Sequence, residues 1–342
     1  MKKNLRDYTL GELEGILTNM GEAKFRAKQI FKWLYSDIES FDDMTNIPSS
    51  LKEKLKSEYS INILKIEQKF ISDIDETRRY LLQLDDGNFI ESVLMKYKHG
   101  YTICISTQVG CAMGCKFCAS TKGGKVRNLT GGEIINQILT VQKDLGSRIS
   151  NVVLMGMGEP LDNFDNVMHF LENVNNPLGI NIGHRHISLS TCGLADRVRT
   201  LADYELQITL SISLHAPNDE KRSRIMPINK KYNIEALMDA CRYYIKKTNR
   251  RISFEYTLIS GVNDTEEEAR ELLALISGML CHINLIPVNE VSDTGFKSTN
   301  RKGVEKFQSV LTNGGISATI RREMGSDISA ACGQLRAAAT RK

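Results

Sequence analysis

The chain has 342 residues, of which 41% are hydrophobic and 25% are charged, an ordinary composition for a globular protein. No run of 18 consecutive apolar residues occurs, and the charged opening MKKNLRDYTL lacks the apolar stretch of a signal peptide, so we expect a cytoplasmic protein without membrane attachment. The net charge of +4 permits a polyanionic partner such as RNA without requiring one. Eight cysteines could form disulfides, but three lie within eight residues, which favours metal binding or catalysis.

Residues 1–95 are predicted to form a small accessory domain that binds RNA. One helix is indicated by the spacing of Phe25, Ala27, Ile30, Phe31 and Leu34. Ser50 with Glu53 predicts a capping box at the next helix, and Asp85-Asp86-Gly87 between RRYLLQL and NFIESVLMKY predicts a hairpin. Basic residues lie opposite the apolar stripe and could contact RNA phosphates, although such a run is more often a solvated face; they are Lys24, Arg26, Lys28 and Lys32.

Residues 96–342 alternate between short apolar strands and helical segments. The predicted strands are YTICIS, NVVLM, HISLS, QITLSIS, ISFEYTL and HINLI, with SATIR as a weaker seventh. Helices are predicted from Thr130, capped with Glu133, and from Thr265 through Ile276. Such alternation implies parallel strands joined by right-handed crossovers, in a barrel or a doubly wound sheet.

The polar motifs favour the barrel, because each of them follows a strand. CAMGCKFC follows the first strand, GMGEP the second, STCG the third, SLH the fourth and LIPVN the sixth. In a barrel these strand ends surround one mouth, so all five motifs would meet at a single site. We therefore expect an α/β fold with an incomplete barrel of six strand and helix units.

Cys111, Cys115 and Cys118 are candidate metal ligands. Structural zinc normally takes four ligands in two pairs, and the next cysteine, Cys192, stands alone far along the chain. Catalytic zinc with three thiolates is the weaker alternative, and three buried thiols on a loop are the bland one. Three thiolates on an iron-sulfur cubane would leave one iron open to another ligand.

The Cx3Cx2C spacing with an aromatic residue before the last cysteine resembles the motif of the radical S-adenosylmethionine (SAM) superfamily. The resemblance implies that SAM chelates the fourth iron and is cleaved to a 5′-deoxyadenosyl radical. Two glycines in GMGE would let the backbone approach a ligand, and Pro160 keeps Glu159 out of helical geometry. Other strand-end residues could hydrogen-bond SAM, although each alone would more often cap an element or satisfy the core; they are Ser190, Ser213, His215 and Asn289.

A narrower resemblance covers nearly the whole chain. FRAKQIFKWLY, ISTQVGCAMGCKFC, RNLTGGEI, VVLMGMGEPL, SLHAPND, MPINKKYNI, NLIPVN and DISAACGQL are similar to the bacterial family of dual-specificity methyltransferases acting on carbon 2 of adenine in 23S ribosomal RNA and transfer RNA. The resemblance implies a 4Fe-4S cluster on the three cysteines. It also implies a SAM site formed by Gly158, Glu159, Ser190, Ser213, Leu214, His215 and Asn289.

In that family's route, Cys332 would carry the methyl group, Glu91 would accept a proton and Cys104 would form a disulfide with Cys332. Two SAM molecules would be used per turnover, because one methylates Cys332 and a second provides the radical. From the residues alone, alternation places Cys104 on the polar face of its strand, whereas Cys332 could be an ordinary buried cysteine.

Three alternatives stay open. A sister family that methylates carbon 8 of adenine usually has alanine at Pro160, which favours carbon 2 here. The others are a non-enzymatic cluster protein that binds RNA and a radical enzyme that activates another protein. No flavin motif or second cysteine cluster is visible, so we expect electrons to come from a small carrier such as a flavodoxin or a ferredoxin. We also expect a monomer.

Overall fold

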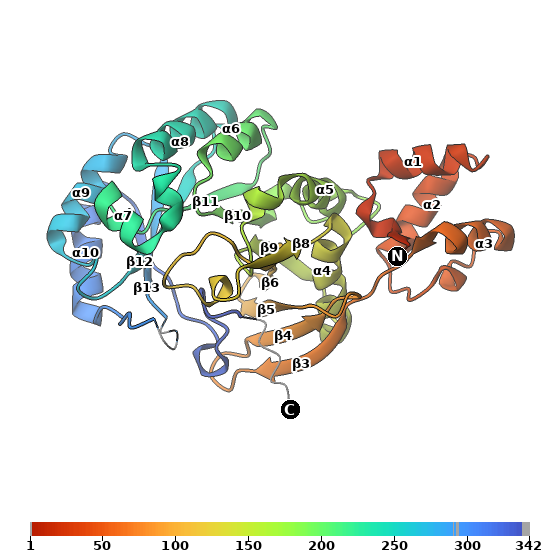
Figure 1. Cartoon of the computed structure of the whole chain (residues 1–342), viewed down its shortest axis with the longest axis horizontal. Helices are drawn as coiled ribbons and strands as arrows, with labels where there is room; N and C mark the ends of the chain where they lie inside the picture. The colour runs from red at the N-terminus through yellow and green to blue at the C-terminus, as the bar shows by residue number, and fades with distance from the viewer. Residues whose placement is uncertain (1, 290, 292–293, 337–342) are drawn as a thin grey trace.

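The computed structural model describes residues 2–289, 291 and 294–336. Its centre is a ten-stranded sheet in the order β14-β13-β12-β11-β10-β9-β6-β5-β4-β3. Seven strands are parallel and curve into an open barrel (Figure 1). They are β6 (Gly100–Cys104), β9 (Ile149–Leu154), β10 (Ile187–Thr191), β11 (Thr209–Ser213), β12 (Ile252–Leu258), β13 (Cys281–Pro287) and β14 (Ala318–Ile320). The six predicted strands, the weaker seventh and the incomplete barrel are confirmed.

Helices in the connections between these strands cover the outside of the barrel (Figure 1). They are α4 (Gly131–Leu145), α5 (Phe164–Asn175), α6 (Ala195–Asp203), α7 (Asp219–Ile225), α8 (Ile234–Thr248), α9 (Glu266–Ile276) and α10 (Arg301–Asn313). The capping boxes predicted at Thr130 and Thr265 are both present. In the described ranges, no helix combines the length and the apolar character that crossing a membrane requires.

The N-terminal helices α1 (Leu10–Asn19), α2 (Phe25–Leu34) and α3 (Ser49–Glu58) form a unit with its own hydrophobic core beside the barrel (Figure 1). The stripe predicted for α2 is buried except at Phe25, which is 55% exposed because it is the first residue of the helix and its ring stacks under Arg26 instead. The capping box predicted at Ser50 is wrong. The helix starts one residue earlier, at Ser49 after Pro48, so Ser50 lies inside its first turn.

The predicted hairpin is present, but it joins a different unit from the one expected. Strand β4 (Arg78–Gln83) pairs with β5 (Phe89–Tyr97), and β3 (Lys65–Ile71) lies beyond β4 at the edge of the sheet. Because β5 pairs with β6, these three strands extend the barrel sheet rather than packing with the N-terminal helices. We therefore propose a division of the chain after β2 (Tyr59–Ser60) instead of at residue 95.

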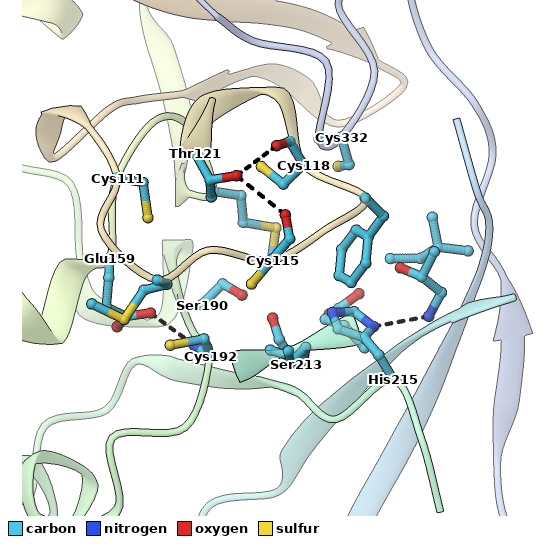
Figure 2. Close-up of a pocket in the computed structure, with 18 of the residues that line it drawn as sticks. Cys111, Cys115, Cys118, Thr121, Glu159, Ser190, Cys192, Ser213, His215 and Cys332 are labelled. Carbon is cyan, nitrogen blue, oxygen red and sulfur yellow. Dashed lines mark hydrogen bonds between the residues drawn. The ribbon is translucent and has the colours of Figure 1, made fainter. Parts of the chain in front are cut away.

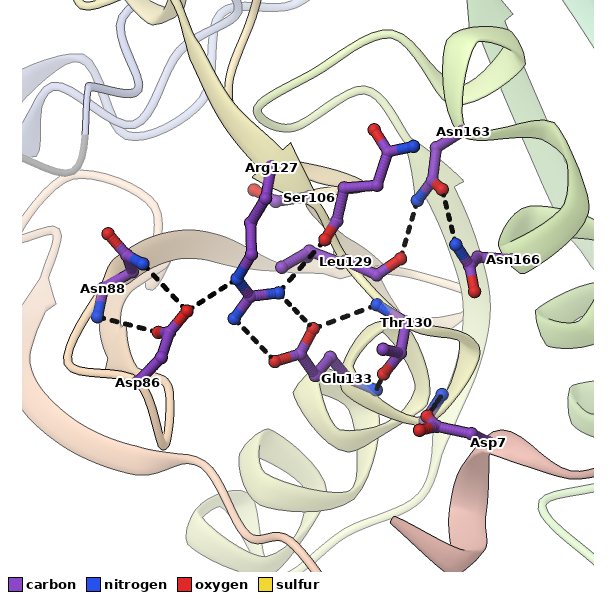
Figure 3. Close-up of polar contacts among 12 residues, drawn as sticks. Asp7, Asp86, Asn88, Ser106, Arg127, Leu129, Thr130, Glu133, Asn163 and Asn166 are labelled. Atoms are coloured by element: carbon purple, nitrogen blue, oxygen red, sulfur yellow. Dashed lines mark hydrogen bonds and ion pairs between the residues drawn. The ribbon is translucent and has the colours of Figure 1, made fainter. Parts of the chain in front are cut away.

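A set of polar contacts fastens the hairpin and the N-terminal unit to the barrel (Figure 3). The Arg127 guanidinium binds both carboxylate oxygens of Glu133 at 2.7 and 2.8 Å, and its Nε donates to Asp86 in the hairpin turn at 2.6 Å. Although burial acts in the opposite direction, hydrogen bonds from Arg127 and Asn88 lower the pKa of Asp86 to about 2. On the N-terminal side, Asp7 accepts from the backbone N–H of Gly132 at the start of α4.

Replacing Arg127 by methionine should lower the free energy of unfolding by about 2 kcal/mol, because Glu133 and Asp86 would lose a bidentate and a single charged hydrogen bond in a partly buried place. Urea denaturation is the measurement. Arg242→Met is the matched control, since Arg242 forms an exposed pair with Asp239, and it should cost less than about 0.5 kcal/mol. Equal losses for the two variants would contradict this reading of the contacts.

Candidate active site

The three candidate cysteines lie on a loop whose ends are held together by backbone geometry. Two short antiparallel strands frame it: β7 (Gln108–Gly110) and β8 (Lys125–Asn128). Gly110 has φ of 74°, and a Cβ there would lie 1.9 Å from the carbonyl oxygen of Gly124, so only glycine fits. Within the loop, the Thr121 hydroxyl donates to the carbonyl oxygens of Cys115 and Cys118. These contacts give the loop a defined shape.

The cysteine loop covers one side of a cavity at the carboxyl ends of the barrel strands, which we call the cysteine cavity. Together with the solvent at its mouth, it takes in about 930 Å³ of space between atoms. Figure 2 shows the cysteine loop on one side and the strand-end residues on the other. The predicted site residues that line it are Cys111, Cys115, Cys118, Gly158, Glu159, Ser190, Ser213, His215, Asn289 and Cys332.

Three predicted site residues are not among the described residues that line this cavity: Leu214, Cys104 and Glu91. The side chain of Leu214 is fully buried in the main core, and its backbone N–H donates to the carbonyl of Glu255. Any contact of Leu214 with a ligand would have to use backbone atoms that already serve the fold.

Gly158 and Glu159 follow β9 in a backbone conformation that their sequence requires. At Gly158 φ is 103°, and a Cβ would come within 2.6 Å of the Gln108 side chain. Glu159 is extended, as expected for a residue before proline, and its carboxylate accepts from the backbone N–H groups of Leu161 and Cys192 at 3.0 and 2.7 Å. Burial raises the pKa of Glu159. The carboxylate thus has a capping role and also faces the cavity.

His215 follows β11 with its ring fixed in one tautomer. Its Nδ1 accepts from the backbone N–H of Thr257 at 2.9 Å, so the ring proton lies on Nε2. The ring packs edge-on against Phe117 of the cysteine loop, with centroids 5.0 Å apart. Burial, aided by the charge of Arg222, lowers the pKa of His215 to about 3. The neutral ring can therefore donate one hydrogen bond to a ligand in the cavity.

Arg222 of α7, which the sequence patterns did not single out, holds the strand ends behind the cavity. Its side chain is fully buried. It donates to the carbonyl oxygens of Cys192, Ser213 and Leu214 at 2.7, 3.1 and 3.1 Å. These contacts tie the end of β11 to the residue after β10, and so set the positions of the polar groups that face the ligand. No motif signals this role, because a lone arginine in a helix usually faces solvent.

The segment that carries Cys332 is bound to the cavity walls by its backbone. Asn289 Nδ2 donates to the carbonyl oxygen of Cys332 at 2.9 Å, and the N–H of Ala119 donates to that of Gly333 at 2.7 Å. The second contact joins the segment directly to the cysteine loop. Cys332, which could have been an ordinary core thiol, thus lies at the cavity because partners on two other segments hold it there.

Cys104 lies behind this segment in a small apolar cluster formed by Val93, Met95, Cys104, Met157, Met324, Ala330 and Leu335. The predicted alternation is confirmed, since Ile103 and Ile105 face the main core on the other side of the strand. The surroundings of Cys104 are not polar as predicted, because the C-terminal segment packs apolar side chains against that face. Burial, with a smaller effect of Cys332, raises the pKa of Cys104 to about 12. Both cysteines are free thiols here.

Glu91 lies on the same face of the sheet as Cys104. Glu91 and Val93 are two residues apart on β5 and therefore share a face, and Val93 pairs directly with Cys104. Its carboxylate is buried, with one oxygen 2.9 Å from Arg79 Nη1 and the other 2.9 Å from the backbone nitrogen of Arg336. The carboxylate is therefore covered by the C-terminal segment.

The three thiols of the loop fit an iron-sulfur cluster better than a single ion. Burial raises the pKa of Cys111 to about 12 and raises those of Cys115 and Cys118 above the ordinary value, so these groups need a cationic centre to become thiolates. Zinc requires all its thiolates about 2.3 Å from one point. Among the described residues, no three histidine, cysteine or acidic side chains surround a single point in that way, whereas a cubane spreads its thiolates over separate irons.

Comparisons with known proteins show which families this chain resembles. Residues 105–273 match the radical SAM superfamily, and residues 3–61 match the ribosomal RNA large subunit methyltransferase N-terminal domain. Proteins named probable dual-specificity RNA methyltransferase RlmN from Clostridium novyi (strain NT) and Alkaliphilus oremlandii (strain OhILAs) are each 58% identical over 335 residues, which cover 98% of both chains. A crystal structure of a radical SAM methyltransferase from Sphaerobacter thermophilus has a TM-score of 0.93 and 42% identity over 98% of this chain and 100% of that one.

The fold and the cysteine cavity therefore define a radical SAM enzyme, which implies a 4Fe-4S cluster and SAM as cofactors. Within that superfamily the chain belongs to the RlmN family.

The buried His215 predicts a specific acid sensitivity. Its pKa rises from about 3 in the folded chain to the ordinary 6.5 on unfolding, so the unfolded chain binds the extra proton and stability should fall as the pH drops below about 6.5. His215→Asn keeps an acceptor for the Thr257 N–H but cannot titrate, so its unfolding free energy should fall less between about pH 6.5 and 4.5. Urea denaturation at several pH values measures this. His99→Asn, at an exposed position, is the control, and its unfolding free energy should change with pH as in the wild type. The same change with pH in His215→Asn would contradict the assignment.

Proposed function

We propose that the chain is an RNA methyltransferase that adds a methyl group to carbon 2 of adenine in 23S ribosomal RNA and in transfer RNA. The observation that carries this proposal is the position of Cys332, which shares one cavity with the three loop cysteines and with Glu159, Ser190 and Ser213. The relatives are named dual-specificity RNA methyltransferases, which supports RNA as the substrate.

Cys111, Cys115 and Cys118 would hold the cluster. The glycine and carboxylate after β9, the serines at the ends of β10 and β11, and the ring of His215 would surround SAM. When bound, these cofactors would supply a methyl group to a nucleophile. They would also supply a carbon radical able to remove a hydrogen atom from a methyl thioether, so each turnover would use two SAM molecules. The donor from His215 Nε2 and the carboxylate of Glu159 suit the polar groups of SAM.

Cys332 would be the methyl-accepting nucleophile. Carbon 2 of adenine has no lone pair, so direct attack on a sulfonium methyl group lacks a nucleophile, whereas a thiolate provides one. The sulfur of Cys332 would then carry the carbon that bonds to the base. The hydrogen bonds from Asn289 to the carbonyl oxygen of Cys332 and from the Ala119 N–H to the carbonyl oxygen of Gly333 would keep that sulfur in place during transfer.

Glu91 and Cys104 would complete the reaction from the other side of the C-terminal segment. Glu91 would accept the carbon-2 proton, which requires the Arg336 N–H to leave its carboxylate. Cys104 would attack the sulfur of Cys332, so that the two sulfurs join, the sulfur–carbon bond breaks and the freed methylene carbon takes up a proton to complete the methyl group on the base. Because burial places the pKa of Cys104 at about 12, this attack requires a change in its surroundings or a proton acceptor at the moment of release.

Further features of the proposal rest on less specific observations. The family that methylates carbon 8 usually has alanine where this chain has Pro160, directly after Glu159. This difference favours carbon 2 over carbon 8. A small carrier such as a flavodoxin or a ferredoxin would supply electrons, and the enzyme would act as a monomer in the cytoplasm.

The test is anaerobic reconstitution with iron, sulfide, SAM, a reductant and ribosomal or transfer RNA fragments, followed by nucleoside mass spectrometry. The proposal predicts 2-methyladenosine from the wild-type enzyme. Cys104→Ala should still methylate Cys332 but accumulate a covalent adduct between protein and RNA, because nothing attacks the Cys332 sulfur. Cys332→Ala should form neither product nor adduct.

Cys241→Ala is the matched control, since Cys241 is a fully buried thiol of α8 in the main core and away from the cavity lining. It should retain 2-methyladenosine formation without an adduct. 8-Methyladenosine as the product would overturn the carbon-2 assignment, and normal turnover by Cys104→Ala would remove that residue from the reaction.

The basic face of α2 is proposed to contact RNA phosphates. Lys24, Lys28 and Lys32 are exposed on the N-terminal unit. Lys28→Glu with Lys32→Glu should weaken RNA binding by about tenfold and flatten its salt dependence, because fewer counterions are released. Filter binding at several salt concentrations measures both quantities.

Lys246→Glu with Lys302→Glu changes the net charge equally on exposed positions of α8 and α10. This control should leave the salt slope nearly unchanged. If both pairs weaken binding to the same extent, the effect is one of overall charge and the α2 face has no special role.

A further inference from the structure

Gln108, the first residue of β7, has a fully buried side chain and is not among the described residues that line the cysteine cavity. Both ends of its amide are hydrogen-bonded. Oε1 accepts from the backbone N–H of Glu159 at 2.9 Å, and Nε2 donates to Asn128 Oδ1 and Asp162 Oδ2, each at 2.8 Å. Only one orientation of the amide satisfies these partners, because a backbone N–H needs an oxygen and a carboxylate needs an N–H. The side chain therefore joins three segments of the site.

The contact with Glu159 fixes a peptide group that its own sequence leaves free. The Glu159 N–H belongs to the peptide that follows Gly158, and a glycine imposes few limits on the rotation of its neighbouring peptides. The side chain of Gln108 packs so closely against Gly158 that a Cβ there would lie 2.6 Å from the Cβ of Gln108. Gln108 thus sets the plane of this peptide and with it the direction in which the Glu159 side chain leaves the backbone.

The contacts at the other end of the amide belong to the frame of the cysteine loop. Gln108 pairs with Asn128 across β7 and β8, three residues before Cys111. Asp162, the third partner, also accepts from Lys125 of β8 at 2.7 Å. One buried side chain therefore connects the strands that frame the cysteine loop with the turn that carries the Glu159 carboxylate.

We propose that Gln108 is a positioning residue for the SAM site, because it holds the Glu159 carboxylate in a fixed place relative to the cysteine loop. The inference rests on the proposed function, which assigns the cluster to the loop and SAM to the space beside Glu159. A ligand that contacts both parts binds well only if their relative position is kept. A buried neutral amide suits this role, since its hydrogen bonds are strong away from water and it adds no charge to the site.

Equilibrium dialysis with labelled SAM tests the assignment in reconstituted enzyme that carries Cys332→Ala, which has no thiol to consume the methyl group. Gln108→Met keeps the length of the buried side chain but removes all three hydrogen bonds. The Kd for SAM should rise about tenfold, a usual cost of losing a group that orients a ligand-binding residue. Iron and sulfide content should stay at the wild-type level, because the three loop thiols remain.

Gln137→Met is the matched control. Gln137 of α4 is equally buried, and its amide makes a comparable set of hydrogen bonds with Ser92 and Ser106. This variant should lower the midpoint of urea denaturation about as much as Gln108→Met but leave the Kd for SAM unchanged. Equal losses of SAM affinity in the two variants would reflect a general loosening of the core and would overturn the proposal.

A pair of changes that keeps the buried groups paired does not depend on the folding of Gln108→Met. Gln108→Glu alone removes the donor to Asp162 and sets a second carboxylate beside it, so SAM binding should weaken. Adding Asp162→Asn supplies an amide N–H to the new carboxylate and leaves one negative charge for Lys125. The double variant should bind SAM within about threefold of wild type, because the contact is restored with reversed polarity. A double variant as weak as Gln108→Glu alone would contradict the assignment.

A double-mutant cycle with Glu159→Ala shows whether Gln108 acts through that carboxylate. Gln108→Met should cost about tenfold in SAM affinity when Glu159 is present and nothing further when it is absent. Additive losses would overturn the proposal, as would loss of the cluster in Gln108→Met, which would confine the effect to the cysteine loop. Failure of the proposed function is distinguishable, because it would appear as a missing or different RNA product of the wild-type enzyme, whereas SAM affinity is measured without RNA.

Discussion

The parallel sheet cannot close on itself, because β5 already pairs with the edge of β6 that β14 would need. The barrel therefore keeps an open seam, and the chain fills it with its own C-terminal segment, residues 321–336. That segment contacts the β3–β5 extension through Asp75 and Glu91 and the cysteine loop through Ala119. The position of Cys332 and the burial of Cys104 both follow from this one departure from a closed barrel.

The two sides of the segment that carries Cys332 differ in a way that suits a carrier of carbon. The cysteine cavity offers thiols, a buried carboxylate and a neutral imidazole, which fit a cluster and a charged cofactor. The far side of the C-terminal segment, toward β5, is lined by Met95 and Tyr97 together with Arg321, Arg322 and Glu323. A sulfur between them can receive a methyl group from one ligand and deliver it to another.

Much of this arrangement could be predicted from the sequence, because local chemistry determines it. Strand-end motifs located the cavity, and capping boxes at Thr130 and Thr265 located two helices. The same logic failed at Ser50, where Pro48 moved the helix start by one residue. Arg222 could not be found, since it lies in a short helix where a lone arginine usually faces solvent. Its role depends on contacts with the ends of two strands that are distant in the chain, which no local pattern records.

The hairpin shows the same limit at a larger scale. Its turn, Asp86-Gly87, was clear from the sequence, but the strand that pairs with the hairpin was not, because the alternation of a strand does not indicate which sheet it joins.

The central claim, that a methyl group reaches RNA through the sulfur of Cys332, is tested most directly with SAM carrying a fully deuterated methyl group. Because the carbon on sulfur must lose one hydrogen before it bonds to the base and regain one on release, the account predicts RNA methyl groups with two deuterium atoms by nucleoside mass spectrometry. Methyl groups that keep all three deuterium atoms would show direct transfer and contradict it.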